Sequence, residues 1–374
     1  MRKAALALTA ISLLLVVLVV GLHSVNASPK TITVPDDYPT IESAIANAND
    51  GDIIFFKNGT YDGPIDQTLI IDKTLSLIGE NVESTVLNLH PKYNVSRILT
   101  QSWYFSDDAI TINANDVKLM DLTLSFMGNI RVNGDNAQII GNDITAWATV
   151  TGLVIAGSNC NITNNVVIQQ IALTGSFNNI QENSFSILFL ESADRNFIDS
   201  NRIRYIQLVH SNDNTISNNN VSTNVDGYAV DLRNSINNFF NGNRVEVDRW
   251  NTDLKLESQS LNNTFYGNAF MGEDELVLLD ATSEGNFWDN GVYGNFWSNY
   301  NGTDLLGDGI GDIPYIIDGN NQDHFPLMNP LSEGETFERP FPTVPIAISV
   351  AVVAAVAAGL LLYNRKRRKE AHQT

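Results

Sequence analysis

A short pattern of apolar and polar positions recurs along the middle of the chain. It consists of an apolar residue, an asparagine three positions later and an apolar residue two positions after that. The eight occurrences are Ile139-Asn142-Ile144, Ile162-Asn165-Val167, Ile180-Asn183-Phe185, Ile198-Asn201-Ile203, Ile216-Asn219-Val221, Phe240-Asn243-Val245, Phe265-Asn268-Phe270 and Phe287-Asn290-Val292. The positions on either side of the second apolar residue are mixed or polar. This period of two predicts a short strand with one buried face in every repeat.

The asparagines lie 23, 18, 18, 18, 24, 25 and 22 residues apart. Such a period is too short for a pair of helices, and the repeats are rich in β-branched residues and asparagine, so a helical solenoid is disfavoured. Strands of successive coils would instead pair in parallel, about 4.8 Å apart. The sequence therefore predicts an all-β fold, a right-handed parallel β-helix. The asparagines are expected at turns, with left-handed backbone and an amide ladder, in a structural role.

The coils need a cap at each end to cover the open core. Residues 41–48 predict a short amphipathic helix, and residues 53–56 predict a first strand after Asp50-Gly51-Asp52. At the other end, five aromatic residues are predicted to plug the core. They are Phe287, Trp288, Phe296, Trp297 and Tyr300.

The two ends of the chain predict its topology. Arg2 and Lys3 precede an uncharged stretch, and Val25-Asn26-Ala27 offers a cleavage site, which is the order of parts in a secretory signal peptide. An uncleaved N-terminal anchor is the alternative. Residues 344–363 carry no charge and are long enough to span a membrane, and the basic tail after them favours the cytoplasmic side. We therefore expect a single-pass cell-membrane protein with its large N-terminal domain outside.

The predicted segments follow from these features. They are a signal peptide (1–27), a cap with the first coils (31–100), Asn-rich coils (101–293), a closing module (294–330), a stalk (331–343), a transmembrane helix (344–363) and a cytoplasmic tail (364–374).

Charge narrows the classes of partner. The whole chain has a formal net charge of −20, and without the cations at its two ends and Glu370 the outer part has 15 basic and 41 acidic residues, near −26. A surface this acidic argues against nucleic acid and anionic membranes. Cys160 is the single cysteine, so no internal disulfide forms. Six Asn-x-Ser/Thr sequons follow the predicted signal peptide, which is typical of an exported glycoprotein. They begin at Asn58, Asn94, Asn161, Asn220, Asn262 and Asn301.

Three stretches carry a family resemblance. Pro35-Asp-Asp-Tyr-Pro-Thr-Ile-Glu-Ser-Ala-Ile with Gly59-Thr60-Tyr61 resembles the N-terminal cap of pectin-lyase-like β-helix proteins. The asparagine coils resemble the repeat of the NosD-like family. The stretch from Gly294-Asn-Phe-Trp-Ser-Asn-Tyr to Asp323-His-Phe-Pro-Leu-Met resembles the closing module of NosD-like surface proteins. The resemblance covers about residues 31–330 and implies the fold, whereas function must be argued from a site.

Candidate binding residues lie at outward positions of the strands that follow the asparagines. They are Trp147, Arg202, Arg204, Arg244, Glu246 and Asp248. Glu246 and Asp248 are two residues apart, about 6.6 Å along a strand, which is near the carboxyl separation of an inverting glycosidase. Any two outward residues of a strand have this spacing, so we expect a solvated face there and assign no catalytic residue. The signature motifs of polygalacturonases and pectin methylesterases are absent from the sequence.

Candidate ligands for two kinds of metal occur along the chain. Asp304, Asp308 and Asp312 recur every four residues with glycines between them, which predicts a structural calcium site in the closing module, with a metal-free acidic turn as the alternative. Copper would need clustered Met, Cys or His residues, and these are scattered along the chain.

Three functional hypotheses result. We favour a surface protein with a structural or binding role whose ligand is a polysaccharide or surface glycan. The alternatives are a polysaccharide lyase or glycoside hydrolase, and a NosD-like accessory protein to a membrane metal or transport complex.

Overall fold

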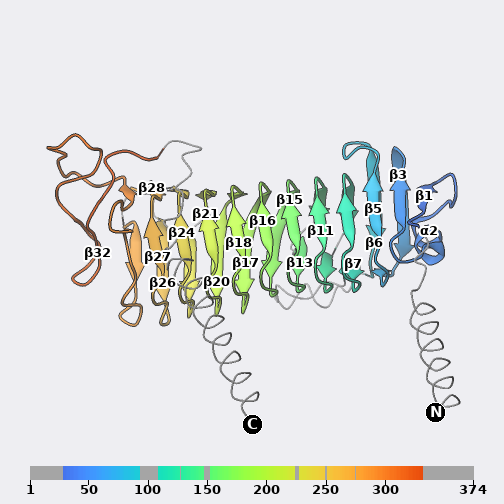
Figure 1. Cartoon of the computed structure of the whole chain (residues 1–374), viewed down its shortest axis with the longest axis horizontal. Helices are drawn as coiled ribbons and strands as arrows, with labels where there is room; N and C mark the ends of the chain where they lie inside the picture. Colours follow the sequence, from blue (N-terminus) through green and yellow to red (C-terminus); the bar gives the residue numbers. More distant parts are fainter. Residues whose placement is uncertain are drawn as a thin grey trace, which may run out of the picture. The chain divides into compact units, whose positions relative to one another are not determined.

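The computed structural model describes residues 28–92, 108–126, 128–146, 152–223, 227–248, 251–273 and 275–331. These residues belong to one compact unit, in which successive coils stack side by side (Figure 1). The fold is the predicted right-handed parallel β-helix. Trp147, the predicted signal peptide, most of the stalk and the 344–363 segment lie outside the described residues. Among the described residues, no helix is long and apolar enough to cross a membrane.

Each coil contributes strands to three faces, which we call A, B and C. Face A is an 11-stranded parallel sheet. Its strands are β1 (Thr31–Val34), β2 (Ile53–Phe56), β5 (Ser76–Gly79), β8 (Lys118–Met120), β11 (Gln138–Ile140), β14 (Asn161–Thr163), β16 (Asn179–Gln181), β18 (Phe197–Asp199), β21 (Thr215–Ser217), β24 (Phe239–Asn241) and β27 (Thr264–Tyr266).

Faces B and C form a continuous 19-stranded sheet, because β15 (Val166–Leu173) and β17 (Ser184–Glu191) run across the corner between them. Face B also contains β3 (Gly59–Ile65), β6 (Thr85–His90), β9 (Thr123–Phe126), β12 (Asp143–Ala146), β19 (Arg202–Ile203), β22 (Asn220–Thr223), β25 (Arg244–Val247), β28 (Ala269–Phe270) and β30 (Phe296–Trp297). Face C also contains β4 (Leu69–Ile71), β7 (Asp108–Ile112), β10 (Asn129–Val132), β13 (Leu153–Ile155), β20 (Tyr205–Val209), β23 (Tyr228–Arg233), β26 (Thr252–Glu257) and β29 (Val277–Leu279).

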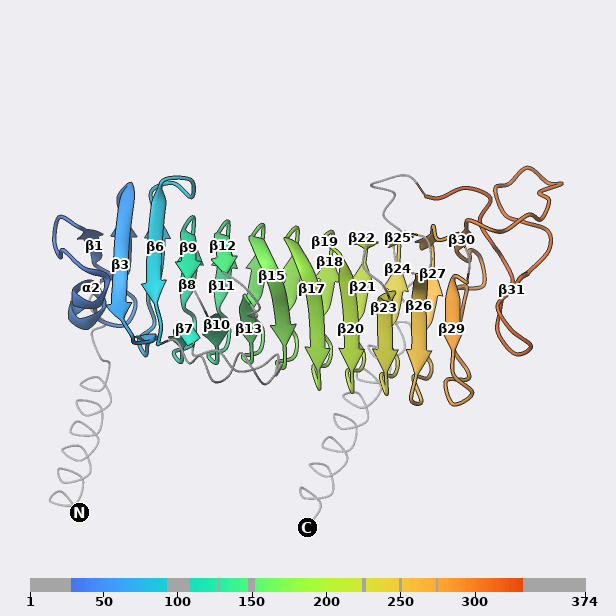
Figure 2. The same cartoon turned by 180° about the vertical axis from the view of Figure 1, so that it is seen from behind.

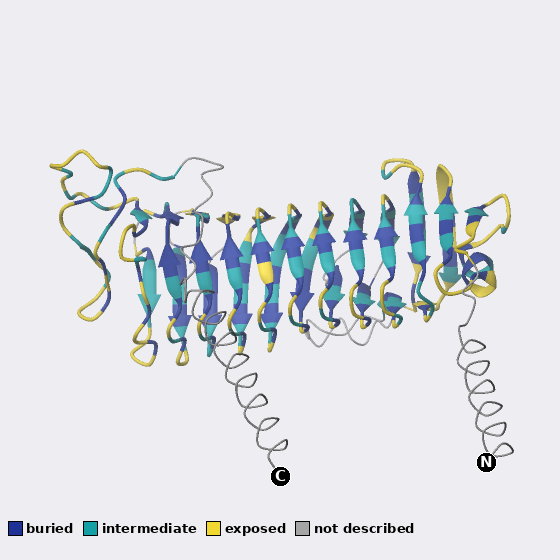
Figure 3. Ribbon diagram, in the orientation of Figure 1, coloured by how far each residue is buried: buried dark blue, intermediate teal, exposed yellow. Residues whose placement is uncertain are grey.

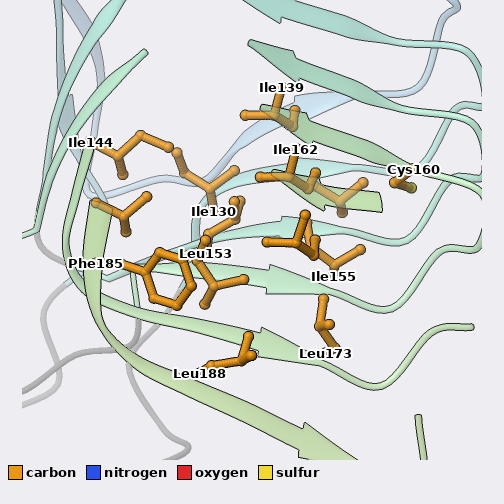
Figure 4. Close-up of a cluster of buried hydrophobic side chains, with 14 of the residues drawn as sticks. Ile130, Ile139, Ile144, Leu153, Ile155, Cys160, Ile162, Leu173, Phe185 and Leu188 are labelled. Carbon is orange, nitrogen blue, oxygen red and sulfur yellow. The ribbon is translucent and has the colours of Figure 1, made fainter. Parts of the chain in front are cut away.

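The core is a set of apolar stacks along the inside of the coils. Ile139 stacks on Ile162 across face A, and Ile130 stacks on Leu153 across face C (Figure 4). All four side chains are fully buried. Buried residues follow the strands, whereas exposed residues gather at the turns and in the C-terminal loops (Figure 3). The predicted alternation of inward and outward positions is confirmed for the coils up to Phe270.

The predicted N-terminal cap is confirmed. Helix α2 (Ile41–Asn47) begins at Thr40, whose hydroxyl accepts a hydrogen bond from the backbone N–H of Ser43 in a capping box. Its buried residues Ile41, Ala44 and Ile45 cover the start of the core.

The predicted asparagine ladder lies at the corner from face A to face B. At Asn183, the backbone N–H and the side-chain Nδ2 donate to Oδ1 of Asn201, at 2.9 and 3.0 Å. The same Nδ2 also donates to the carbonyl of Ile162 in the preceding coil. Buried amides that are this fully paired stabilise the stack and are not free to bind a ligand.

The backbone expectation for these asparagines was wrong. The left-handed residue is the one that precedes the ladder asparagine, such as Glu182 (φ 55°) and Gly242 (φ 66°). The side chain of the ladder residue points inward to make the amide bonds, whereas the residue before it makes the turn.

A second ladder, at the corner from face C to face A, was not predicted. Its residues are Asn178, Asn196, Asn214, Asn238, Asn263 and Asn286. Asn178 accepts on Oδ1 from Cys160 N–H, and each later member accepts the backbone N–H of the member one coil earlier, for example Asn196 N–H to Asn214 Oδ1 at 2.9 Å. The structure thus has two asparagine ladders, one at each of two corners of the coils.

The last predicted coil has a different register. Phe287 and Val292 are more than half exposed, whereas Trp288 and Trp297 are buried. The next ladder member is Asn295, whose Oδ1 accepts from Asn268. Strand β30 pairs with β28 and therefore extends face B beyond residue 293, where the coils were expected to end. The two buried tryptophans form the main part of the aromatic plug.

The closing module ends the first ladder with a carboxylate. Strands β31 (Tyr315–Ile316) and β32 (Gln322–Asp323) form a small antiparallel pair. Asp323 is fully buried and takes the place of a further asparagine, since its Oδ2 accepts from Asn295 N–H at 2.6 Å and from Trp297 Nε1 at 2.9 Å. Burial raises its pKa to about 6 in spite of these donors.

Candidate functional site

The predicted binding residues on face B line up but make few contacts. Arg202, Asn220 and Arg244 are register partners on β19, β22 and β25. Arg244 Nη2 lies 3.5 Å from Glu246 Oε2, with both side chains about half exposed. Arg202, Arg204, Glu246 and Asp248 are exposed. The face is solvated, as expected, and its use as a binding site stays a prediction.

A denser polar cluster lies on the outer side of face C, over β20, β23 and β26, which lie side by side in Figure 2. We call it the face C network. Its residues are Tyr205, Gln207, Tyr228, Asp231, Arg233, Lys255 and Glu257. Register places Gln207, Asp231 and Lys255 in one row across the strands, with Arg233 and Glu257 in the next row.

Asp231 is the centre of the face C network. Its side chain is fully buried, and its Oδ2 accepts from Arg233 Nη2 at 2.7 Å, Arg233 Nε at 2.9 Å, Tyr205 Oη at 3.1 Å and Gln207 Nε2 at 3.1 Å. Its Oδ1 has no hydrogen-bond partner among the described residues. Burial, and next the charge of Asp231, raise the pKa of Tyr205, so its hydroxyl stays protonated as a donor.

Glu257 joins the two cations of the network. Its Oε1 lies 3.0 Å from Arg233 Nε, and its Oε2 lies 2.6 Å from Lys255 Nζ. Lys255 Nζ also lies 4.5 Å from the ring centre of Tyr228, at cation–π distance. The hydrogen bond to Glu257 raises the pKa of Lys255. Two carboxylates thus balance two cations, while the Arg233 side chain stays 43 % exposed.

Stability alone does not account for this network. The row that contains Gln207, Asp231 and Lys255 continues to apolar residues at both ends, with Ala172 and Phe189 before it and Leu278 after it. Strand pairing therefore does not require charge in this row. Burying a carboxylate carries a desolvation cost that an ion pair often fails to offset, and apolar replacements are often neutral or stabilising. A cluster that is costly to bury and exposes an arginine is a candidate functional site.

Sequence reasoning missed the face C network because it placed only the strands after the ladder asparagines. The network belongs to the next strand of each coil, and the coil lengths there change from 18 to 24 and 25 residues, which hides the register of Asp231 against Gln207 and Lys255. The available signal was the run of alternating polar residues in Asp231-Leu232-Arg233 and Lys255-Leu256-Glu257.

The interior beneath the network offers no room for a ligand. A void there has a volume of only about 10 Å³ and is lined mainly by apolar side chains, including Val230, Phe240 and Leu254. That is at most the size of one water molecule. Ligands of the network must therefore bind on its solvent side.

The acidic residues predicted to bind calcium accept hydrogen bonds from the backbone of their own loop. Asp304 Oδ1 accepts from Gly307 N–H at 2.6 Å, and its Oδ2 accepts from Gly309 N–H at 2.9 Å. Asp308 and Asp312 accept from Ile310 and Leu305 N–H. No group of three or more His, Cys, Asp or Glu side chains suited to a metal occurs in the part of the chain that the structure describes. Calcium binding stays a prediction, and a chelator-induced fall in melting temperature would support it.

The fold and the face C network place this protein in the class of parallel β-helix proteins with a packed core and a polar outer face. Residues 127–302, somewhat less than half of the chain, match the family described as periplasmic copper-binding protein (NosD), so this part of the parallel β-helix is NosD-like.

Curated relatives agree with this assignment over a short segment. The probable ABC transporter binding proteins NosD of Stutzerimonas stutzeri and Pseudomonas aeruginosa are 35 % and 34 % identical over 95 residues, a quarter of this chain. The match spans only about a fifth of their own length, 21 % and 22 %. Among solved structures, the Dettilon tailspike protein aligns with a TM-score of 0.53 at 14 % identity, over 70 % of this chain and 66 % of its own. This likeness shows the fold.

In the part of the chain that the structure describes, two histidines and the cysteine each have surroundings of their own and are not gathered in a cluster of three or more ligands. His90 lies against Asp62, and His324 lies against Asp289. Cys160 is buried between coils, and burial raises its pKa to about 11, which disfavours the thiolate that binds metal.

Proposed function

We propose that this protein binds a neutral glycan on the outer side of face C. The observation that carries the proposal is the network of Asp231, Arg233, Lys255 and Glu257, in which buried Asp231 fixes Arg233, while the Arg233 guanidinium and the Glu257 carboxylate are partly exposed to solvent. A sugar hydroxyl group can accept a hydrogen bond from a guanidinium N–H and donate one to a carboxylate oxygen. Tyr228 and Tyr205 add aromatic surface beside them.

Charge favours a neutral glycan over an acidic one. The two cations of the network are already paired with carboxylates, so no excess positive charge remains for an anionic sugar. The chain as a whole carries a formal charge of −20, which repels polyanions at low ionic strength.

Arg233→Ala tests the proposal directly. The substitution removes the guanidinium donors and leaves Asp231 without its charged partner, so we expect at least a tenfold loss of affinity for the best ligand on a glycan array of neutral polysaccharides. Arg202→Ala on face B is the matched control and should bind normally. Equal binding by both variants and the native chain would refute the site. Release of an unsaturated product from a uronic-acid polysaccharide, assayed separately, would instead support the lyase hypothesis.

We further propose that the chain is exported and tethered by residues 344–363, with residues 28–343 outside the cell. The basic tail after this apolar segment and the sequons before it support the orientation. Protease treatment of intact cells should digest an epitope placed after Ser28 and spare one placed after Thr374. Protection of both epitopes would contradict the tether.

An accessory role in a membrane transport complex is a second candidate, because the matched relatives are named as transporter binding proteins. Crosslinking in native membranes followed by purification of the full chain tests it. Recovery of a transporter subunit in a fixed ratio would support this role, and its absence from a crosslinked sample would oppose it.

A further inference from the structure

Two consecutive coils have unusual residues at one of their turns. At the corner from face C to face A, one residue in each coil adopts a left-handed backbone just before the second asparagine ladder. In most coils it is Asn, Asp or Gly, as at Asp116, Asn136, Asn159, Asp213, Asn237, Asn262 and Gly285. Two consecutive coils instead have Phe177 (φ 60°) and Arg195 (φ 56°). A bulky aromatic residue is disfavoured in this conformation, and such strain is concentrated at functional sites.

Phe177 is not placed there to fill the core. Its side chain is 54 % exposed, and the guanidinium of Arg195 lies over its ring at 5.6 Å from the ring centre. Arg195 is held from the other side by Asp213, at 3.6 Å. Two residues after Arg195, Phe197 begins β18 with its side chain 37 % exposed on the outside of face A. Phe197 lies one coil after Phe177 and two residues further along the strand direction. The spacing between strands and the rise per residue place the two residues roughly 8 Å apart.

On the outside of face A, the positions in register with Phe197 in the two preceding coils carry amide side chains. Asn179 and Asn161 are its register partners one and two coils earlier. Asn179 Nδ2 donates to Asn161 Oδ1 and to Gln181 Oε1, both at 2.8 Å. This leaves a fixed amide edge beside the aromatic rings, at a distance of about one rung.

We propose that Phe177, Arg195 and Phe197 form a stacking site for the apolar face of a neutral pyranose ring, with Asn179 beside it to pair with the sugar hydroxyl groups. The C–H groups of a pyranose pack against aromatic faces, and the Oδ1 of Asn179 can accept a hydrogen bond from a sugar hydroxyl, since both N–H groups of this amide already donate to Asn161 and Gln181. The single cation is neutralised by Asp213, so the site suits an uncharged sugar. The inference shares its ligand class with the proposed function, but it uses different residues at a different corner of the coils.

Saturation-transfer NMR on the full chain tests the site, with cellohexaose, maltohexaose and mannohexaose as probes. We expect transfer from aromatic protons to the ring protons of at least one probe, reduced at least fivefold by Phe177→Asn and by Phe197→Thr. Both replacements are residues that the same row carries in other coils. Phe287→Asn changes an equally exposed phenylalanine elsewhere and should leave the transfer unchanged.

Three results would overturn the inference. They are no transfer with any of the three probes, transfer that Phe177→Asn and Phe197→Thr leave intact, or a lower melting temperature for Phe177→Asn, which would show that Phe177 serves the fold. We expect that melting temperature to stay the same or rise, since asparagine suits the left-handed turn. Arg233→Ala separates the two proposals, because it should weaken binding at face C at least tenfold and leave the Phe177-dependent transfer in place.

Discussion

At the scale of single residues, the two corner positions of each coil have opposite requirements. The ladder asparagine must be an amide, because its Oδ1 accepts from one neighbour while its Nδ2 donates to another and to a carbonyl. The residue before it needs only a left-handed backbone, which Glu182, Ser200 and Gly242 all provide. The recurring chemistry of the repeat therefore lies in the side chain at one position and in the backbone at the other.

Asn201→Ala tests this division. It removes the Nδ2 bonds to Ile180 O and Asn219 Oδ1 and leaves the backbone N–H of Asn183 without its acceptor. Unsatisfied buried groups cost about 1–3 kcal/mol each, so we expect a loss of roughly 2–4 kcal/mol in the free energy of unfolding by urea.

The matched control is Glu182→Gly, at a position where other coils already carry glycine. Glycine removes the strain of the left-handed backbone, which stabilises the fold by about 1 kcal/mol. It also raises the entropy of the unfolded chain, which destabilises the fold by about the same amount, so the net change in the free energy of unfolding should be small. A loss as large as that of Asn201→Ala would contradict the division of roles.

At the scale of elements, two buried carboxyl groups, one in a late coil and one in the closing module, make the stability of the fold depend on pH. Asp253 on β26 is fully buried, its Oδ2 accepts only backbone donors such as Gly272 N–H at 3.1 Å, and burial raises its pKa from 3.8 to about 7. Asp323 has a pKa of about 6 for the same reason. The folded state therefore binds more protons than the unfolded state between about pH 4 and pH 7, so stability falls as pH rises through this window.

Asp253→Asn should flatten this pH dependence. At pH 8 the native chain carries a buried charge at this position, and the variant lacks it, so the variant should be more stable by up to about 4 kcal/mol. At pH 4 the two proteins should unfold at similar urea concentrations, since Asp253 is then protonated. Urea titrations across pH 4–8 measure both limits, and parallel curves at all pH values would exclude the assigned pKa.

The ladder end supplies a second test at this scale. Asp323→Asn keeps an oxygen acceptor for Asn295 N–H and Trp297 Nε1, as in every earlier rung, and should retain most of the stability. Asp323→Ala leaves both donors buried without an acceptor and should cost roughly 2–5 kcal/mol. Intrinsic tryptophan fluorescence during urea unfolding reports on Trp297 directly. Equal stabilities of the two variants would show that Asp323 does not close the ladder.

The same elements show how far sequence predicts this molecule. Periodicity of apolar residues predicted the coils because buried strands repeat with a period of two, and the amphipathic stretch 41–48 predicted α2 because its signal is local. The last coil failed, since Phe287-Asn290-Val292 fits the local pattern while Trp288, Asn295 and Trp297 pack better on the preceding coil. The face C network escaped prediction because its residues meet only through register between coils of unequal length.

At the scale of the whole solenoid, stability is a sum over neighbouring coils. Each coil contacts the one before it and the one after it, and the ladder bonds repeat at every junction. Three successive spacings of 18 residues, from Asn165 to Asn219, make these coils nearly interchangeable. Removal of a complete coil therefore leaves both asparagine ladders continuous, whereas removal of a partial coil interrupts them.

Deletion of residues 184–201 applies this argument. The deletion joins Asn183 to Arg202, so Asn183 meets Asn219 and Asn178 meets Asn214 in the register that each ladder already uses. We expect a folded protein whose melting temperature falls by roughly 10 °C or less, because one coil junction is lost. Deletion of residues 184–192, half of the same coil, is the control and should prevent cooperative unfolding, since it moves every inward residue of the next strands out of register.

The full-coil deletion also separates the two glycan sites. It removes Arg195 and Phe197 but leaves Asp231, Arg233 and Glu257 on their own coils. Arg233-dependent binding on the array should therefore persist, while saturation transfer through Phe177 should be lost, because its stacked cation and its aromatic partner are gone. A folded deletion variant that loses both signals would show that the face C network depends on the deleted coil, and one that keeps both would place the stacking site elsewhere.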